Sequence, residues 1–300
     1  MSEGSMELLV GMEEVRVRFG GREALRGVSL EVHAGELVAV VGSDGAGKTT
    51  LLRAMAGLLR PGSGRVVLRV GKEDLGYSGA EFDLYGDLTV EENLAFLAAV
   101  RGMERRSMVA ARDRLLALVG LTEARGRLAA KLSGGMKKKL GLAGALMHEP
   151  RLLLLDEPTV GVDPASRREL WDVVAQAHAW GTAVVFTTTY LDEAERAGRM
   201  LDLQAGVLRG DYRAAEEVRE QGWSAWRVCL PAARGPVRAR LHQLGLGGTV
   251  YLTSEGMTLL VLDRTEAEET ARRILGPEET AVGRGLEPIP LTLEDVFVIS

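Results

Sequence analysis

One stretch of the chain has the residue types and the spacing of a phosphate-binding loop. It fits the pattern G-x-x-x-x-G-K-[ST] without gaps, at Gly42, Ser43, Asp44, Gly45, Ala46, Gly47, Lys48 and Thr49. Glycines let backbone N–H groups curl around phosphate oxygens, which bulkier residues would block. The pattern places Lys48 for the β- and γ-phosphates of a nucleotide and the Thr49 hydroxyl for Mg²⁺. A helical pattern that begins at Thr50 adds the positive end of its dipole to the site.

Asp156 and Glu157 form a pair of carboxylates directly after the apolar run Leu152–Leu155. If this run is a buried strand, the pair lies at its carboxyl end, where open α/β sheets bind their ligands. Asp156 is then the natural direct or indirect holder of Mg²⁺, and Glu157 can orient or polarise an attacking water. Alone, such a pair is more often an ordinary start of a loop. Beside a phosphate loop, the functional interpretation is favoured.

The elements that must position these residues alternate between apolar runs and helical patterns. Continuous apolar runs, typical of strands buried on both faces, occur at Leu37–Val41, Arg151–Leu155 and Ala183–Thr187. Helical patterns occur at Val90–Gly120 with a break near Gly102, Ser133–Met147, Pro164–Trp180 and Leu191–Ala197. This alternation predicts an α/β fold with a parallel sheet covered by helices. Residues 6–32 alternate apolar and polar side chains around a Gly-Gly turn, which predicts two antiparallel strands.

The chain has 300 residues, of which 46% are hydrophobic, and a formal net charge of −5. This length predicts about two domains, which we place at residues 6–215, with a helical part at about 90–148, and at residues 222–300. In the second domain the expected order strand-helix-strand-strand-helix-strand is compatible with a ferredoxin-like α+β fold. No apolar run approaches the ~20 residues that span a bilayer, and one cysteine excludes an internal disulfide. A cytoplasmic protein without a membrane span is expected.

The slightly acidic balance argues against a general nucleic-acid binder. A basic run at Lys137, Lys138 and Lys139 is interpreted as a solvated helix face, and no nucleic-acid partner is expected. The four histidines show no ligand spacing, so no transition-metal site is expected.

A third segment, Leu132-Ser133-Gly134-Gly135-Met136, precedes a helical pattern. Ser133 can cap this helix, and two glycines let an anion approach free backbone N–H groups. This segment lies between the phosphate loop and the acidic pair along the chain. With these three motifs in that order, residues 6–215 resemble the ATP-binding-cassette (ABC) ATPases, whose signature motif is Leu-Ser-Gly-Gly-Gln. The resemblance implies a P-loop NTPase cassette with a RecA-like core, N-terminal antiparallel strands and a helical subdomain.

Further stretches resemble the ABC-2-type export ATPases, particularly multidrug-efflux members and the first cassette of tandem-cassette members. They are Gly76-Tyr77, Leu84–Leu94, Gly161–Trp171, Tyr190–Glu195 and Leu293–Val298. The resemblance implies that ATP and Mg²⁺ lie between two head-to-tail cassettes, with the phosphate loop of one facing the signature segment of the other, here Ser133, Gly134 and Gly135. It also implies that Phe19 stacks on adenine and that Asp163 lies at the dimer seam. The alternatives are a core aromatic for Phe19 and a plain helix N-cap for Asp163.

The sequence departs from the family pattern at two positions. Ala80 stands where the family has a glutamine that contacts Mg²⁺ and water, and alanine has no polar group to replace it. Thr189 stands where the family has a histidine, and threonine is shorter and carries no imidazole. Some export ATPases also lack this histidine, so the loss of both groups weighs more than the loss of one.

Three functions remain open from the sequence. The favoured one is the ATPase subunit of an ABC exporter, which works with separate transmembrane permease subunits and a second cassette, identical or different, at the inner face of the cell membrane. The second is a catalytically weak nucleotide-binding or regulatory half that pairs with a competent ATPase; its competitor is a working homodimer in which waters and neighbours replace the missing groups. The third is a soluble ABC protein that serves no transporter.

Overall fold

The computed structural model describes residues 6–80, 84–213, 224–228, 250–252, 257–261, 269–270 and 286–289. The chain divides into two compact units, Met1–Asp211 and Tyr212–Ser300. Among the described residues no helix combines the length and the apolar character needed to cross a bilayer.

The first unit begins with a three-stranded antiparallel sheet. Its strands follow the order β2-β1-β4 and are β1 (Leu8–Phe19), β2 (Arg22–His33) and β4 (Ser63–Leu68). The expected antiparallel pair is confirmed as β1 and β2, joined at a tight turn in which Gly20 has φ 58°. The third strand, β4, was not predicted, because its pattern after Pro61-Gly62 is short and half exposed.

A six-stranded sheet forms the centre of this unit, in the order β5-β6-β7-β3-β8-β9. Its strands are β3 (Leu37–Val41), β5 (Leu75–Ser78), β6 (Leu152–Leu155), β7 (Ala183–Thr188), β8 (Arg199–Gln204) and β9 (Val207–Arg213). The pairs β5–β6, β6–β7, β7–β3 and β3–β8 are all parallel. The parallel sheet predicted from the apolar runs is therefore confirmed, and the carboxyl ends of β6, β7 and β3 meet at one edge.

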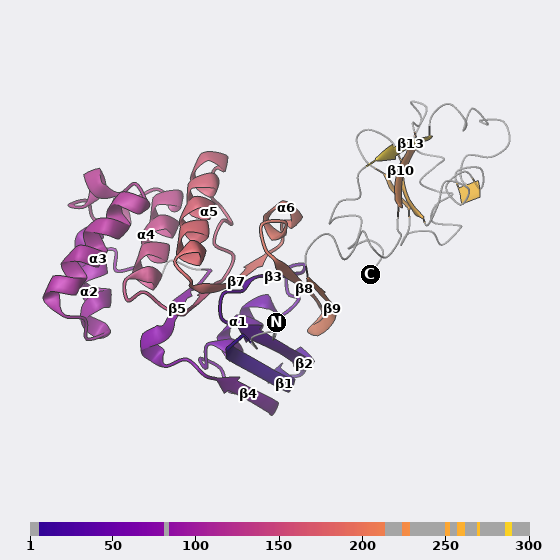
Figure 1. The fold of residues 1–300 in the computed structure, drawn as a ribbon, viewed down its shortest axis with the longest axis horizontal. Coiled ribbons are helices and arrows are strands. Elements are labelled where there is room, and N and C mark those ends of the chain that lie inside the picture. The colour runs from indigo at the N-terminus through magenta and orange to yellow at the C-terminus, as the bar shows by residue number, and fades with distance from the viewer. Residues whose placement is uncertain are drawn as a thin grey trace, which may run out of the picture. The chain divides into compact units, whose positions relative to one another are not determined.

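Helices occupy the segments in which helical periodicity was found. They are α1 (Lys48–Met55), α2 (Val90–Val100), α3 (Arg105–Leu118), α4 (Gly134–Leu146), α5 (Pro164–Ala179) and α6 (Leu191–Ala194). Short 3₁₀ turns lie at Lys72–Asp74, Thr122–Ala124 and Ala129–Lys131. In Figure 1 the helices α2 to α5 stand beside one another on one side of the unit, and α4 packs against α2, α3 and α5. The predicted break near Gly102 is confirmed between α2 and α3.

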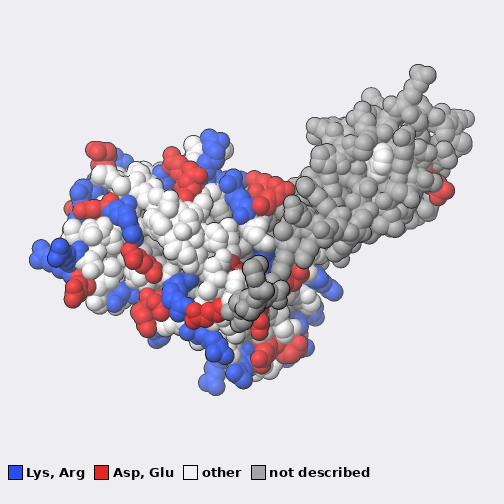
Figure 2. Space-filling view, in the orientation of Figure 1, with Lys and Arg blue, Asp and Glu red and all other residues white. Residues whose placement is uncertain are grey.

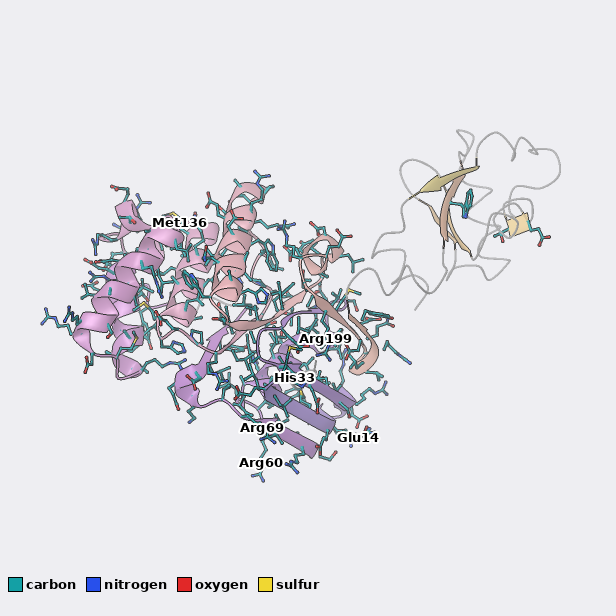
Figure 3. All side chains as sticks on the ribbon, in the orientation of Figure 1. Glu14, His33, Arg60, Arg69, Met136 and Arg199 are labelled. Atoms are coloured by element: carbon teal, nitrogen blue, oxygen red, sulfur yellow. The ribbon has the colours of Figure 1, made fainter. Side chains whose placement is uncertain are left out.

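A buried arginine ties three strands of the first unit together. Arg199 on β8 donates to the Glu31 carbonyl on β2 at 2.7 Å and to Asp211 on β9 at 2.7 and 2.5 Å. Arg199 and His33, both labelled in Figure 3, share the Glu36 carboxylate, which accepts from Arg199 Nη1 at 3.2 Å and from the His33 N–H at 2.8 Å. The hydrogen bond to Asp211, together with the nearby carboxylates, raises the pKa of Arg199 above its ordinary value.

Four strands of the second unit form an antiparallel sheet in the order β11-β12-β10-β13. They are β10 (Ser224–Val228), β11 (Val250–Leu252), β12 (Met257–Val261) and β13 (Leu286–Ile289). The first strand lies between the third and the fourth, as a split βαβ arrangement requires. The segment between β10 and β11, where the first helix of this domain is expected, and the tail motif Leu293–Val298 lie outside the described residues, so the ferredoxin-like fold and the domain limits remain predictions.

Glu193 on α6 is the hub of a buried network that joins three segments of the first unit. Its carboxylate is 1% exposed and accepts from Thr159 Oγ1 at 2.5 Å and Thr188 Oγ1 at 2.7 Å. Trp171 Nε1 on α5 donates to it at 3.4 Å, and Arg167 Nε lies 3.6 Å away. A buried carboxylate needs such donors, because losing water without replacement costs several kcal/mol.

Replacing Glu193 with alanine leaves buried donors on three segments without an acceptor. We expect Glu193→Ala to lower the free energy of unfolding by about 3 kcal/mol, measured by urea titration of tryptophan fluorescence. The control Glu195→Ala removes an exposed carboxylate from the same segment and is expected to change stability by less than about 0.5 kcal/mol. Equal losses of stability in the two variants would contradict the central role of Glu193 in this network.

Asp202 is a carboxylate buried in β8, where it pairs with Val41 at the end of β3. It is 1% exposed. Gln204 Nε2 donates to Oδ2 at 2.8 Å, whereas Oδ1 has no hydrogen-bond partner among the described residues. Burial therefore raises the pKa of Asp202 above its ordinary value.

Because the folded state holds this proton more tightly than the unfolded chain, Asp202 supports stability at pH values below the unfolded pKa. That contribution is lost as the pH rises through the folded pKa. We expect Asp202→Asn, which carries no charge, to gain stability relative to the parent chain as the pH rises above about 4, the ordinary pKa of an aspartate. Denaturant titrations of both proteins on both sides of this pH measure the difference. A constant difference would show that Asp202 titrates normally.

Candidate nucleotide-binding site

The phosphate loop connects β3 to α1 at the carboxyl edge of the central sheet. Its first and last glycines are required by close backbone approaches. A Cβ at Gly42 would lie 2.2 Å from the Leu203 carbonyl oxygen, and one at Gly47, where φ is 108°, would lie 2.5 Å from the Ala24 carbonyl oxygen. The loop is therefore wedged between β8 and β2. Since α1 begins at Lys48, its free N–H groups open onto the loop.

Lys48 is almost entirely buried, with 4% of its surface exposed. Its ammonium donates to the carbonyl oxygens of Gly42 at 2.8 Å and Ser43 at 3.2 Å. Glu157 Oε1 lies 3.1 Å from the same nitrogen. The structure therefore brings together the lysine and the glutamate that were predicted separately, although 109 residues separate them (157 − 48).

Asp156 lies at the end of β6 and is 1% exposed. Its Oδ1 accepts from Thr187 Oγ1 at 2.8 Å, and its buried Oδ2 has no hydrogen-bond partner among the described residues. A buried carboxylate oxygen without a donor is the kind of atom that a divalent cation or its water satisfies. The residues present thus fit Mg²⁺, with the half-buried Thr49 hydroxyl in the first turn of α1 as the other predicted ligand.

Glu157 has an uncommon backbone conformation, with φ 47° in the left-handed region. A non-glycine residue there carries steric strain, which persists only where the surroundings hold it and which is concentrated at functional sites. Its N–H donates to Thr187 Oγ1 at 2.9 Å. In this conformation the carboxylate faces Lys48 at the start of α1.

The signature segment caps α4 as predicted, since Ser133 Oγ accepts from the Met136 N–H at 3.3 Å. Gly135 is packed so closely that a Cβ would lie 2.8 Å from Ser166 Oγ on α5, whereas Gly134 is exposed. Asp163 caps α5 by accepting from the N–H groups of Ala165 and Ser166 at 3.1 and 3.0 Å. These bonds, the one from Ser166 first, lower the pKa of Asp163. The N-cap role weighed for Asp163 is thus present, and it leaves the side chain exposed.

Phe19 lies at the end of β1 with 55% of its surface exposed, so the alternative of a core aromatic is wrong. Arg22, across the same turn, donates from Nη2 to the Gly45 carbonyl oxygen at 3.4 Å. The hairpin end therefore reaches the phosphate loop, as an adenine-stacking role for Phe19 requires.

The two departures from the family pattern lie at the carboxyl edge of the sheet. Ala80 follows β5 and is exposed, and its carbonyl oxygen accepts from Lys138 Nζ at 2.7 Å. Thr189 follows β7 and is half-buried. The structure thus places both positions directly beyond the two strands that neighbour β6, and Asp156 and Glu157 follow β6 itself.

Sequence reasoning missed three side chains near the site and misread one run. Thr187, Thr188 and Glu193 are polar residues in apolar surroundings, and only their tertiary contacts reveal their roles. The lysine run is not a solvated face, because Lys138 and Lys139 are 8% and 7% exposed. Lys139 forms an ion pair with Glu169 at 2.5 Å. The sequence did contain a signal for this burial. After the lysines, apolar residues lie on every side of α4, which is typical of a helix in the core.

Comparison with known proteins gives the family. The family model described as ABC transporter matches residues 25–160. A probable multidrug ABC transporter ATP-binding protein of Escherichia coli is 44% identical over 214 residues, which are 67% of this chain and 37% of that protein, so the chain spans little more than a third of it. A daunorubicin resistance ATP-binding protein of Streptomyces coeruleorubidus is 35% identical over 94% of this chain and 92% of its own length.

Solved structures agree with this fold. The ATP-binding subunit of an ABC transporter matches 71% of this chain and 92% of its own with a TM-score of 0.65 and 26% identity. A dimeric ATP-binding cassette in a post-hydrolysis state with ADP and Pi matches 68% and 98% with a TM-score of 0.62 and 23% identity. The predicted P-loop cassette fold is therefore confirmed. On the strength of the full-length resemblance to the drug-resistance protein, this chain belongs to the family of ABC transporter ATP-binding proteins.

Proposed function

We propose that this chain is the ATP-binding and ATP-hydrolysing subunit of an ABC exporter. The observation that carries the proposal is the meeting of Lys48 and Glu157 at 3.1 Å beside the buried Asp156, at the carboxyl edge of a parallel sheet. The relatives named for multidrug transport and daunorubicin resistance favour a drug-like cargo. Transmembrane permease subunits at the cell membrane and a second cassette are the partners that this function needs.

The phosphates of ATP would enter the loop between β3 and α1, where the N–H groups of Gly42–Thr49 and the start of α1 favour anions. A γ-phosphate near Lys48 would compete with Glu157 for the ammonium. Once separated from Lys48, Glu157 is free to accept a proton from the attacking water. Thr49 and Asp156 would hold Mg²⁺, whose chemistry here is to neutralise charge on the phosphate oxygens.

The remaining parts of the site would come from two directions. Phe19 at the exposed hairpin end would stack on adenine, next to Arg22. The start of α4, where Ser133 and Gly134 are exposed and Gly135 is buried beneath them, would approach the phosphates held by a second cassette, because free helix N–H groups attract anions. The capped, exposed Asp163 would lie at the seam between the two cassettes.

A second candidate function, a catalytically weak half of an asymmetric pair, is favoured by Ala80 and Thr189. The Ala80 side chain has no polar group that could bind water, and the Thr189 hydroxyl is shorter than the family's histidine and carries no titrating imidazole. In this form the chain binds ATP tightly and hydrolyses it slowly at its own loop. Its intact signature segment completes the competent site of its partner.

Removal of the Glu157 charge separates binding from hydrolysis. We expect Glu157→Gln to lower the rate of ATP hydrolysis about 100-fold or more, because the general base is lost. ATP affinity should be equal or higher, because Lys48 loses a competitor. Phosphate release and fluorescent-nucleotide titration measure the two effects, and Glu195→Gln serves as an exposed-carboxylate control. Undiminished hydrolysis in Glu157→Gln would exclude Glu157 as the base.

Restoring the family's side chains tests the weak-half candidate. The purified parent chain is expected to hydrolyse ATP slowly, and the double variant Ala80→Gln/Thr189→His to hydrolyse it about tenfold faster or more, since two groups that stabilise the transition state return. Steady-state phosphate release at saturating ATP gives the comparison. Turnover of the parent chain equal to that of an ordinary cassette, and abolished by Glu157→Gln, would rule this candidate out.

A further inference from the structure

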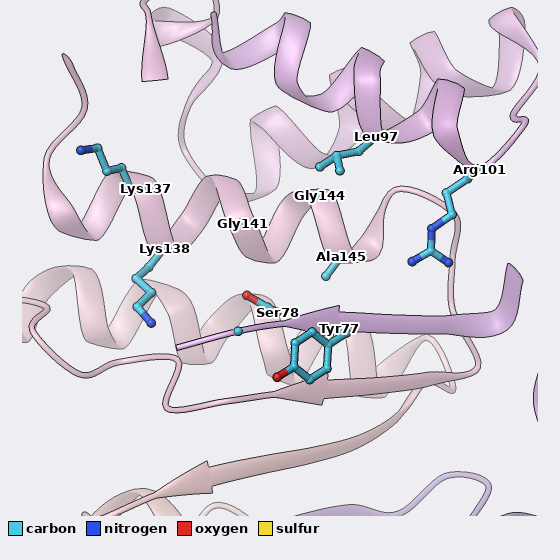
Figure 4. A pocket seen from close by; sticks show the side chains of 10 residues that line it. Tyr77, Ser78, Leu97, Arg101, Lys137, Lys138, Gly141, Gly144 and Ala145 are labelled. Atoms are coloured by element: carbon cyan, nitrogen blue, oxygen red, sulfur yellow. The ribbon is translucent and has the colours of Figure 1, made fainter. Parts of the chain in front are cut away.

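Lys138 is a buried cation on α4 that the proposed chemistry does not use. It is 8% exposed, and a buried ammonium must find oxygen acceptors to offset its lost hydration. Its Nζ donates to the Ala80 carbonyl oxygen at 2.7 Å and to the Glu157 carbonyl oxygen at 3.2 Å. In Figure 4 its side chain extends from α4 toward the end of β5, whereas the neighbouring Lys137 points away.

The carbonyl that Lys138 holds belongs to the strained residue of the site. Glu157 has φ 47°, a conformation that costs about 1–3 kcal/mol and persists only when neighbouring groups impose it. Its N–H is held by Thr187 Oγ1 from β7 at 2.9 Å, and its carbonyl by Lys138 from α4 at 3.2 Å, with a longer backbone bond from the Val160 N–H at 3.4 Å. Both polar backbone groups of Glu157 are therefore fixed by side chains of other elements.

This clamp also determines where the Glu157 carboxylate lies. With the backbone held on both sides, Oε1 lies 3.1 Å from Lys48 Nζ. If the clamp were released at its α4 side, the left-handed turn could relax, and the carboxylate would move relative to the phosphate loop. Lys138 thus acts on Lys48 only through Glu157.

The helix that carries Lys138 begins at the signature segment. Ser133 caps α4, and Lys138 lies about one and a half turns further along the same helix. A continuous helix moves as a rigid element, so a shift of its first turn is transmitted to Lys138 without a flexible joint. An anion bound at Ser133–Gly135 would therefore bias the position of Glu157 at the other end of this connection.

We infer that Lys138 is a positioning residue that holds Glu157 against Lys48 and connects the signature segment to the carboxylate of the chain's own phosphate loop. The inference rests on the proposed function, because it assumes that the loop binds ATP and that Glu157 acts there. In a pair of cassettes, a nucleotide on the phosphate loop of one cassette would contact the signature segment of the other. Through α4 and Lys138 it would then alter the position of Glu157 in that other cassette.

A double-mutant cycle on nucleotide affinity tests the inference independently of turnover. The full-length variants are Lys138→Met, Glu157→Gln and the combination, titrated with a non-hydrolysable ATP analogue and Mg²⁺. In the parent background, Lys138→Met should tighten binding about threefold to tenfold, because the loosened carboxylate leaves Lys48 to the phosphates. In the Glu157→Gln background, where no ion pair remains to be lost, the same change should alter affinity less than about twofold.

Two matched substitutions control for general effects on α4. Lys137→Met removes the adjacent lysine of the same helix and should leave the affinity unchanged in both backgrounds. Lys138→Gln keeps one N–H₂ donor and should fall between the parent chain and Lys138→Met. It also supplies a second cycle if the methionine variant folds poorly, as judged by its Tm.

Each outcome separates the inference from the function on which it rests. An equal shift in both backgrounds, or no shift in either, would overturn the role of Lys138. The proposed function would still stand if the parent chain binds ATP and Glu157→Gln loses hydrolysis. A parent chain that does not bind the analogue would overturn the proposed function, and the inference with it.

Discussion

The site depends on one electrostatic requirement, which is that the buried ammonium of Lys48 must be surrounded by oxygen atoms. At 4% exposure it cannot rely on water, so two loop carbonyls and the Glu157 carboxylate supply its acceptors. The carbonyls require the loop to curl back on itself, which the glycines at 42 and 47 allow because a Cβ there would collide with neighbouring backbone. The carboxylate requires β6 to end beside β3 with only β7 between them. The acceptors of Lys48 thus require both this strand order and this loop conformation.

Polar side chains between the strand ends carry this arrangement outward. Thr187 connects the side chain of Asp156 to the backbone of Glu157, and Thr188 connects the same edge to Glu193. Through Glu193 the connection reaches Thr159, four residues before the cap Asp163. Because each of these groups is buried, each must keep its partner, and a displacement of one segment is felt by the next. Figure 2 shows that acidic and basic side chains are interspersed on the visible face of the first unit, so this face carries no large patch of one sign.

The two departures from the family pattern have different structural settings. Ala80 keeps its backbone role, since its carbonyl binds Lys138, although its methyl group offers nothing to a ligand. Thr189 lies between Thr188, which is tied to Glu193, and Tyr190, whose ring carries the guanidinium of Arg167 at 4.6 Å. Both segments are therefore held in place while the family's polar side chains are missing. A site with this character suits binding more readily than fast turnover, which is why the asymmetric pair stands beside the symmetric one as a candidate.

The sequence by itself determined the local features of this protein. Glycine spacing specified the phosphate loop, the 3.6-residue period specified the helices, and continuous apolar runs specified the buried strands β3, β6 and β7, because each of these signals depends on neighbouring residues. It also identified Lys48 and Glu157 in separate motifs without showing that they touch. The tertiary structure decided what no local pattern records: the pairing of β4 with β1, the exposure of Phe19, the left-handed turn at Glu157, and the burial of Lys138 in a run that looked solvated. These depend on which segments, distant in the chain, come together to satisfy buried polar groups, and only the folded molecule contains that information.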